Sequence, residues 1–331
     1  MPRGAGGAGG GCEVTPIEVT TKAKRLGAYI ARVTVRESAS LAALTARVVD
    51  YAGLFPPAGL EMPDAVEAYA RYLTDPHGAI VGRFVVPVAR LAELADSAAR
   101  LWLGNQAPWR VAALAGSDQA SDARCIAEFN AKYRGHAEID GVEVKAATQT
   151  EISTAVAALA ASVSASRVYV EIPVDSMSLV PAIAKSGASA KIRTGGVTTD
   201  AFPSASEVVR FIEVCRDHKV AFKATAGLHH PLRGRYRLTY TPDSPVGWMH
   251  GFLNVFLAAV FIREGLGTRE AASLMEEQAP AAFRFDDAGA AWRDHTLTVD
   301  KIRDVRDHFA HAFGSCSFRE PVDDLTALGL L

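Results

Sequence analysis

The sequence is poor in cysteine, in net charge and in long apolar runs. Its four cysteines are scattered over 331 residues, with no CxxC pair and no spacing typical of a disulfide framework. The formal net charge at pH 7 is only -2, which does not indicate a polyanionic partner such as nucleic acid. The longest apolar run, residues 252–262, is too short to cross a bilayer. We therefore expect a soluble, cytoplasmic protein that binds neither nucleic acid nor membrane; a homo-oligomer is left open.

Nucleotide-binding signatures are missing as well. No GxGxxG segment follows the first predicted strand, and no Walker-type GxxxxGK[ST] segment occurs anywhere. The doubly wound open sheet, which is the competing fold, thereby loses its main positive signal.

The first 38 residues differ in kind from the rest. Residues 4–11 are glycine and alanine, and no apolar segment of a secretory signal follows them. The basic stretch 22–36 could form an amphipathic targeting helix, but we favour a flexible tail or translation from an upstream start codon. The chain is therefore predicted to consist of a tail, residues 1–38, and one folded domain, residues 39–331.

From about residue 41, short apolar runs alternate with segments whose apolar residues stand three and four apart. This alternation repeats about every 25 to 35 residues, which is typical of βαβ units and a parallel sheet. Strands are predicted at residues 48–53, 84–88, 111–114, 142–146, 168–173, 190–195 and 221–225, with an eighth near 252–256. Helices are predicted between them at residues 63–73, 91–103, 121–133, 150–163, 177–185 and 204–218. Seven or eight such repeats favour an α/β fold of the (β/α)8 TIM-barrel type.

The alternation of predicted strands and helices ends near residue 266. Residues 268–278 are predicted to form a helix, followed by a hairpin that turns at residues 287–289 and by a last helix at 299–313. We expect this region to be a C-terminal elaboration of the barrel, because it is too short for a core of its own.

Charged residues occur in four consecutive predicted strands, where a barrel strand should be apolar. They are Glu143, Lys145, Glu171, Lys191, Arg193 and Lys223. Because strand side chains alternate between two faces, the apolar neighbours face the helices and the charges point into the barrel. Internal ion pairs that only hold the barrel together are one explanation. We favour an active site at the C-terminal mouth, where barrel enzymes keep their chemistry.

Four of these six charges are positive, which favours a small anionic metabolite as the ligand, with Arg193 as the fork for its oxyanion. Two neighbouring lysines can lower each other's pKa, so that a free amine becomes available near neutral pH. Lys191 and Lys223 would then support Schiff-base chemistry on a carbonyl compound, with Glu171 moving protons. Glu143 and Lys145 complete the predicted catalytic set.

The segments Lys191-Ile-Arg-Thr-Gly-Gly and Lys223-Ala-Thr-Ala-Gly-Leu resemble the two lysine strands of deoxyribose-phosphate aldolase and its class I aldolase relatives. The resemblance covers only these two strands. It implies a carbon–carbon lyase that needs no cofactor, in which Lys191 forms the Schiff base and Lys223 tunes it.

Two adjacent histidines, His229 and His230, follow the seventh predicted strand, where the loops of a barrel build its active site. They are candidate substrate-binding residues together with Arg233 and with Asp50 at the end of the first strand. Alternatively, Glu171 and the two histidines would hold a divalent metal ion for a lyase or hydrolase reaction. A third hypothesis is a non-catalytic barrel that binds an anionic ligand.

Overall fold

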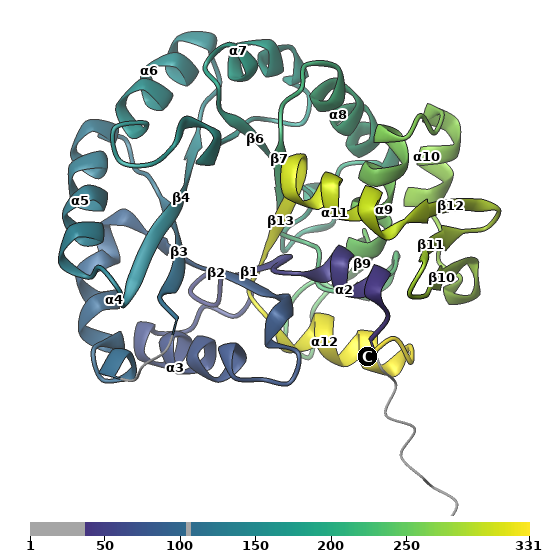
Figure 1. Ribbon diagram of the computed structural model, residues 1–331, viewed down its shortest axis with the longest axis horizontal. Helices are drawn as coiled ribbons and strands as arrows, with labels where there is room; N and C mark the ends of the chain where they lie inside the picture. Colours follow the sequence, from purple (N-terminus) through teal and green to yellow (C-terminus); the bar gives the residue numbers. More distant parts are fainter. Residues whose placement is uncertain (1–36, 104–106) are drawn as a thin grey trace, which may run out of the picture. The chain divides into compact units, whose positions relative to one another are not determined.

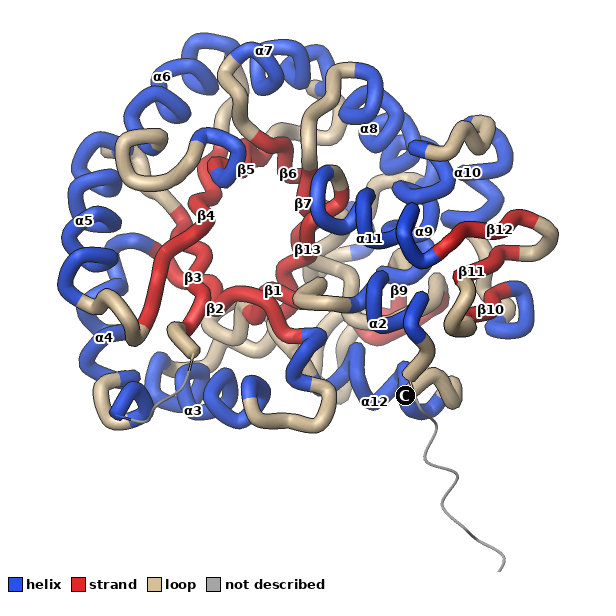
Figure 2. The backbone as a smooth tube through the Cα atoms, in the orientation of Figure 1, coloured by secondary structure: helices blue, strands red, loops and turns tan. Residues whose placement is uncertain are grey.

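The computed structural model describes residues 37–103 and 107–331. Eight parallel strands close into a barrel in the order β1-β13-β7-β6-β5-β4-β3-β2, with helices around it (Figure 1). The closed ring of strands is also visible in the backbone trace of Figure 2. The barrel strands are β1 (Val49–Tyr51), β2 (Val81–Pro87), β3 (Trp109–Leu114), β4 (Ala137–Lys145), β5 (Val168–Glu171), β6 (Ser189–Arg193), β7 (Phe222–Thr225) and β13 (Ala310–Ser315). The predicted (β/α)8 barrel is confirmed.

Amphipathic helices separate the first seven barrel strands. They are α3 (Met62–Leu73), α4 (Leu91–Ala98), α5 (Gln119–Lys132), α6 (Gln149–Leu159), α7 (Val180–Lys185) and α8 (Ala205–Asp217), preceded by α2 (Ala39–Thr45) before β1. Short 3-10 turns are η1 (Gly78–Ile80), η2 (Val88–Arg90), η3 (Leu101–Leu103), η4 (Ala165–Arg167), η5 (Met177–Leu179), η6 (Thr199–Ala201) and η7 (Pro280–Ala282). Helix α8 begins with a capping box, in which the Ser204 and Glu207 side chains each accept from the other residue's backbone N–H.

The eighth barrel strand does not lie where the sequence analysis placed it. Residues 252–256 begin helix α9 (Phe252–Arg263), and β13 closes the barrel by pairing with β1 and β7. Helix α11 (Val299–His308) keeps only the first part of the helix predicted at 299–313. The first eleven residues of α9 are all buried. A uniformly apolar run fits a buried helix as well as a buried strand, so periodicity could not distinguish them.

The region from residue 266 onward lies within the barrel sequence rather than after it. Between β7 and β13 the chain forms the hairpin β8 (Gly234–Arg237) and β9 (Val246–Met249), helices α9 and α10 (Thr268–Met275), a three-stranded sheet, and α11. The sheet consists of β10 (Phe283–Phe285), β11 (Gly289–Trp292) and β12 (His295–Thr298). Its β10 and β11 pair antiparallel across the predicted turn at residues 287–289. Helix α12 (Arg319–Ala327) follows β13.

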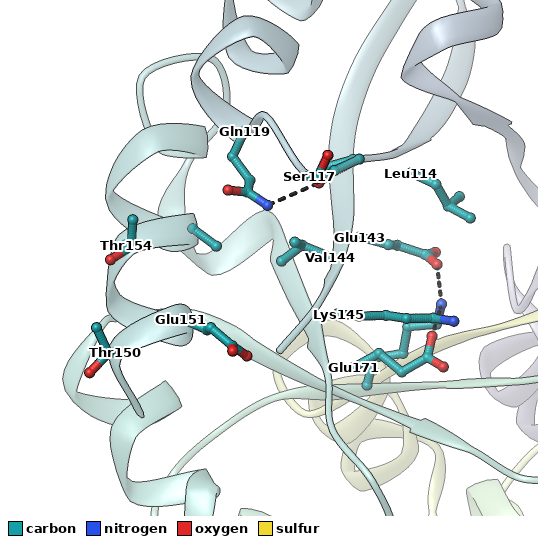
Figure 3. Close-up of a pocket in the computed structure, with 14 residues that line it drawn as sticks. Leu114, Ser117, Gln119, Glu143, Val144, Lys145, Thr150, Glu151, Thr154 and Glu171 are labelled. Carbon is teal, nitrogen blue, oxygen red and sulfur yellow. Dashed lines mark hydrogen bonds and ion pairs between the residues drawn. The ribbon is translucent and has the colours of Figure 1, made fainter. Parts of the chain in front are cut away.

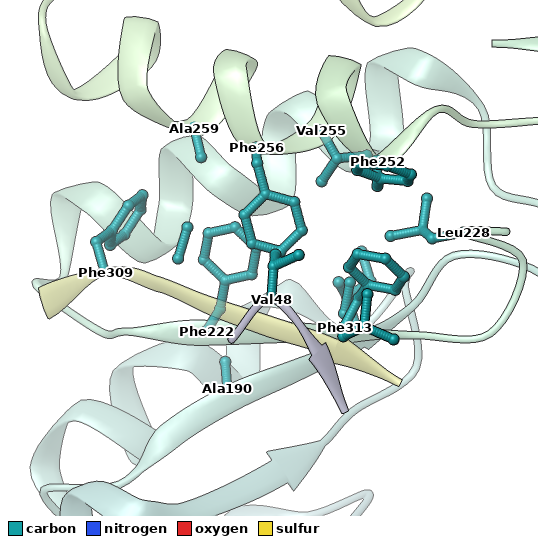
Figure 4. Close-up of a cluster of buried hydrophobic side chains, with 14 of the residues drawn as sticks. Val48, Ala190, Phe222, Leu228, Phe252, Val255, Phe256, Ala259, Phe309 and Phe313 are labelled. Atoms are coloured by element: carbon teal, nitrogen blue, oxygen red, sulfur yellow. The ribbon is translucent and has the colours of Figure 1, made fainter. Parts of the chain in front are cut away.

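Helix α9 packs on the outside of the barrel through aromatic side chains (Figure 4). The ring centroid of Phe313 on β13 lies 5.3 Å from that of Phe252 and 5.9 Å from that of Phe256. Aromatic pairs of this kind stabilise a core beyond the burial of their apolar area. Within residues 37–103 and 107–331, no helix is both long and apolar enough to cross a membrane.

Asn254 is the polar residue within the buried stretch of α9. Its amide donates to the carbonyl oxygens of Leu274 (2.8 Å) and Glu277 (2.9 Å), and its Oδ1 accepts from the Arg233 backbone N–H (3.0 Å). These bonds join α9 to the end of α10 and to the loop after β7.

We expect Asn254→Leu to lower the free energy of unfolding by about 2–4 kcal/mol, because three backbone groups lose their partner. Urea denaturation followed by circular dichroism measures this change. As a matched control, Leu257→Met in the same helix should cost less than about 1.5 kcal/mol. Equal stability of Asn254→Leu and the wild type would contradict the role assigned to these bonds.

Candidate active site

The charged side chains of β4 to β7 point into the barrel, and four of them share one row of the strand register. In the parallel register, Glu171 is opposite Lys145 on β4 and opposite Lys191 on β6, and Lys191 is opposite Lys223 on β7. The two lysines therefore share one face of the sheet. Strand alternation accounts for this, since the apolar residues between them face the surrounding helices.

Glu143 joins the two lysines. Its Oε2 lies 2.5 Å from Nζ of Lys191, and its Oε1 lies 2.5 Å from Nζ of Lys223. Burial by itself raises the pKa of Glu143, but the two ammonium groups outweigh burial and lower it to about 2. A carboxylate held in this way remains ionised at neutral pH.

Lys223 is the deeper of the two lysines, with a side chain that is 1% exposed. Its Nζ lies 2.5 Å from Oδ2 of Asp50 and 5.3 Å from the centroid of the Tyr169 ring. Burial favours a lower pKa for Lys223, but Asp50 and Glu143 outweigh burial and raise it above its usual range. Two neighbouring ammonium groups alone would lower each other's pKa, as the sequence predicts. The carboxylates of Asp50 and Glu143 reverse this direction for Lys223.

Asp50 lies behind Lys223. It is fully buried, and its Oδ1 accepts from the backbone N–H of Arg83 at 2.7 Å. Asp50 is predicted from the sequence to bind substrate. In the structure it contacts Lys223 and is not among the residues that line the cavity at the ends of the strands.

A cavity of about 340 Å³ opens at the C-terminal ends of the strands. Glu143, Glu171 and Lys191 form part of its lining, together with the loops that follow β1, β6, β7 and β13. A larger cavity of about 690 Å³ beside β4 and α6 is lined by the same three residues and by Lys145 (Figure 3). Lys191 is thus the lysine of the pair that a ligand can contact.

Lys191 lies between two carboxylates. Its Nζ is 2.5 Å from Oε2 of Glu143 and 2.7 Å from Oε2 of Glu171. Burial raises the pKa of Glu171, but Lys191 and then Arg193 and Lys145 lower it below its usual range. Both carboxylates are close enough to exchange a proton with the Lys191 amine.

Two further cations lie at the rim of the cavity. Nε of Arg193 is 3.4 Å from Oε1 of Glu171, and the Arg193 side chain is 49% exposed. Lys145 is exposed at the end of β4 and lines the cavity as well. An exposed guanidinium and an ammonium at one mouth provide a site for an anionic group of a ligand.

The two adjacent histidines have different surroundings. His229 lines the cavity, and its Nδ1 lies 2.9 Å from Oε2 of Glu320 on α12. His230 has its Nδ1 2.6 Å from Oδ2 of Asp324, and its ring stacks on Tyr236 with the centroids 3.5 Å apart. Only His229 of this pair lines the cavity around Lys191.

Arg233, the remaining predicted substrate-binding residue, contacts an aromatic ring. It lies over the ring of Trp248, 5.3 Å from its centroid.

In the part of the chain that the structure describes, no group of three or more His, Cys, Asp or Glu side chains could hold a metal ion. Glu171, His229 and His230, the alternative metal ligands, each contact a different ion-pair partner. Metal dependence stays a prediction.

Several charged residues near the site were not predicted. Arg83 on β2 binds Asp140 on β4 (2.5 Å), and Asp140 also binds Arg110 on β3 (2.6 Å). A charge within an apolar strand is also the signal for Arg83 and Asp140. It was missed because the predicted strands begin after the observed starts of β2 and β4. Glu320 carries no such signal, because α12 comes into contact with His229 only in the closed fold.

These features define the class of the protein: a (β/α)8 barrel with an ion-paired cavity at the C-terminal ends of its strands, a fold typical of enzymes. A scan of protein-family models and searches of curated proteins and of solved structures found no match to this chain.

We expect Glu143→Gln to lower the free energy of unfolding by about 3–5 kcal/mol, because two buried ammonium groups lose a shared carboxylate. The pKa of Glu143 in the folded protein is about 2, against an ordinary value of 4.5. The stabilisation from this shift is therefore complete above pH 4.5 and is lost as the pH falls toward 2. Denaturation curves over this pH range measure it.

The variant Glu143→Gln should lack this part of the acid dependence. The matched control is Glu93→Gln, which breaks an exposed ion pair with Arg90 and should change stability little. Parallel acid profiles for the wild type and Glu143→Gln would contradict the ion pairing described for Glu143.

Proposed function

We propose that the protein is a carbon–carbon lyase of the aldolase type, in which Lys191 forms a Schiff base with a small anionic carbonyl compound. One observation carries the proposal: Lys191 lines the cavity and its Nζ has carboxylates at 2.5 and 2.7 Å, while Lys223 is buried and does not line it. Schiff-base formation needs an amine that touches the substrate and an acid–base group within hydrogen-bond reach. The place of Lys191 in the cavity lining and its two neighbouring carboxylates support this role.

The amine of Lys191 must lose a proton before it can attack a carbonyl carbon. Glu143, with a pKa of about 2, is a weak acceptor because two lysines hold it. The low pKa of Glu171 depends on Lys191 and also on Arg193 at the rim. A substrate carboxylate that binds Arg193 would weaken its hold on Glu171, raise the pKa of Glu171 and favour proton transfer from Lys191. Substrate binding and amine activation would thus be coupled.

In the proposed reaction, Nζ of Lys191 attacks the carbonyl carbon, and water leaves with a proton returned by Glu171. The resulting iminium ion accepts the electron pair of the adjacent carbon–carbon bond. That bond breaks as the hydroxyl on the departing fragment loses its proton, which gives an enamine and a second carbonyl compound. The enamine carbon then takes up a proton to form an iminium ion, and hydrolysis of this ion restores Lys191. Lys223 and Asp50 would act as positioning residues that keep Glu143 ionised and in place.

Reduction with sodium borohydride tests the role of Lys191. Incubation of the protein with pyruvate, glyoxylate or acetaldehyde before reduction should give a covalent adduct that peptide mass spectrometry locates at Lys191. Lys191→Arg should abolish the adduct, and Lys185→Arg, at an exposed lysine of α7, should retain it. Anion binding without any adduct on Lys191 would instead support the non-catalytic ligand-binding barrel.

Arg193→Gln tests the anion site. We expect the variant to need about tenfold or more pyruvate for half-maximal adduct formation, because a hydrogen bond between two charged groups is lost. Acetaldehyde has no carboxylate, so its concentration dependence should change little. Arg303→Gln, at an exposed arginine paired with Asp300, is the control and should behave as the wild type. An equal loss for acetaldehyde and pyruvate would contradict anion recognition by Arg193.

A further inference from the structure

His229, which lines the cavity, is paired with a carboxylate that follows β13. Nδ1 of His229 lies 2.9 Å from Oε2 of Glu320, and the hydroxyl of Tyr240 donates to the same oxygen at 2.8 Å. Burial raises the pKa of Glu320, but its contacts with His229 and Tyr240 lower it below its usual range. Glu320 therefore remains an ionised acceptor that fixes the orientation of the His229 ring.

This contact leaves the other ring nitrogen of His229 open. A carboxylate at Nδ1 favours the tautomer that carries its proton there, so that Nε2 has a lone pair. Among the residues that the structure describes, Nε2 has no hydrogen-bond partner, and it is not one of the fully buried polar atoms left without one. His229 lines the same cavity as Lys191. An accessible Nε2 without a partner among the described residues is available to accept a hydrogen bond from a ligand.

The loop that carries His229 is held against the strand that carries Lys191. Gly227, with φ of +74°, lies so close to Gly195 that a Cβ placed on Gly195 would be 2.8 Å from its Cα. Only glycine fits both positions without displacing the backbone. The loops after β6 and β7 therefore meet directly, two residues before His229.

Glu320 is held just as firmly from the other side. The preceding residue Arg319 forms an ion pair with Asp75 at 2.9 Å, and the fully buried ring of Phe318 lies 4.7 Å from that of Tyr72. These contacts fix the start of α12 against the end of α3 and the turn after it. The pair is thus preorganised by two separate elements of the fold.

We propose that His229 is the general base and acid of the reaction, and that Glu320 is its positioning residue. This inference rests on the proposed Schiff base at Lys191. When the carbon–carbon bond next to the iminium ion breaks, Nε2 of His229 takes the proton of the hydroxyl on the departing fragment. The O–H electron pair forms the new C=O bond, and the C–C pair enters the enamine. His229 then gives a proton to the enamine carbon, which forms the iminium ion that hydrolysis releases from Lys191. The reverse reaction retraces both transfers.

The electrostatics of the cavity favour His229 over the carboxylates as the group that takes the hydroxyl proton. The lysines lower the pKa values of Glu143 and Glu171, so these carboxylates are poor acceptors for the proton of a weakly acidic hydroxyl. An imidazole is the side chain that most often transfers such protons near neutral pH. Lys191 would activate the carbonyl, and His229 would handle the proton of the fragment that leaves.

Pyruvate in D2O provides a partial reaction that tests the role of His229. Once pyruvate is bound to Lys191 as an iminium ion, removal of a methyl proton gives the same kind of enamine, and its reversal introduces deuterium. Proton NMR follows the exchange. His229→Gln should slow the exchange about 100-fold or more and should retain the borohydride adduct at Lys191, which also reports that the variant folds.

Glu320→Gln should slow the exchange about 10- to 100-fold, and Glu320→Asp should restore part of the rate. Nitrogen-15 NMR of the imidazoles should show the Nδ1–H tautomer for His229 in the wild type and a mixture of tautomers in Glu320→Gln. The matched controls His308→Gln and Asp304→Asn alter an exposed pair on α11, 3.2 Å apart, and should exchange as the wild type does.

The outcomes separate the two proposals. A Lys191 adduct together with an unchanged exchange rate in His229→Gln overturns the role of His229 and leaves the Schiff base intact. An Nε2–H tautomer of His229 in the wild type also overturns this role. Absence of any adduct in the wild type overturns the proposed function, and with it the step assigned to His229.

Discussion

The barrel interior can hold its charges because the carboxylate of Glu143 is shared by two buried ammonium groups. An unpaired ion in this position would cost several kcal/mol. The register of β4 to β7, together with Asp50 from β1, prevents that cost by placing carboxylates between and beside the lysines. The charges then alternate in sign in the order Asp50, Lys223, Glu143, Lys191 and Glu171. Each charge is satisfied by its neighbours, and the order of the row depends on the bridging carboxylate.

The alternation also makes the two lysines different from each other. Lys223 lies at the inner end, with carboxylates on both sides and an aromatic ring beside it. Lys191 lies where the row reaches the cavity, and its outer partner Glu171 is shared with the half-exposed Arg193. The inner part of the row is therefore buried, whereas the outer part lines the cavity. Schiff-base chemistry at Lys191 would need an amine that reaches the cavity and a carboxylate that stays ionised beside it. The difference in depth between Lys191 and Lys223 fits this need.

The sequence predicted those features that depend on local periodicity. The repeated strand–helix pattern identified the barrel, and period-two alternation placed the charges of β4 to β7 on its inner face. The closing strand β13 was not predicted, because it contains His311 and Gly314 and lacks a strong apolar run. The apolar run of α9 was taken for a strand in its place, because α9 is apolar on all sides. The partners of the charges could not be predicted, because they depend on register and on depth. Pairing of Glu143 with both lysines is a property of three strands at once.

Closure of the barrel explains why the acid–base groups of one cavity come from distant parts of the chain. β13 lies between β1 and β7, so the helix that follows it begins beside the loop that carries His229. Lys191 depends on β4 and β5 for its partners, whereas His229 depends on Glu320 of α12. Amine and imidazole are thus held by separate sets of contacts. A substitution in one set can leave the other in place, which is the condition under which amine reactivity and proton transfer can be measured independently.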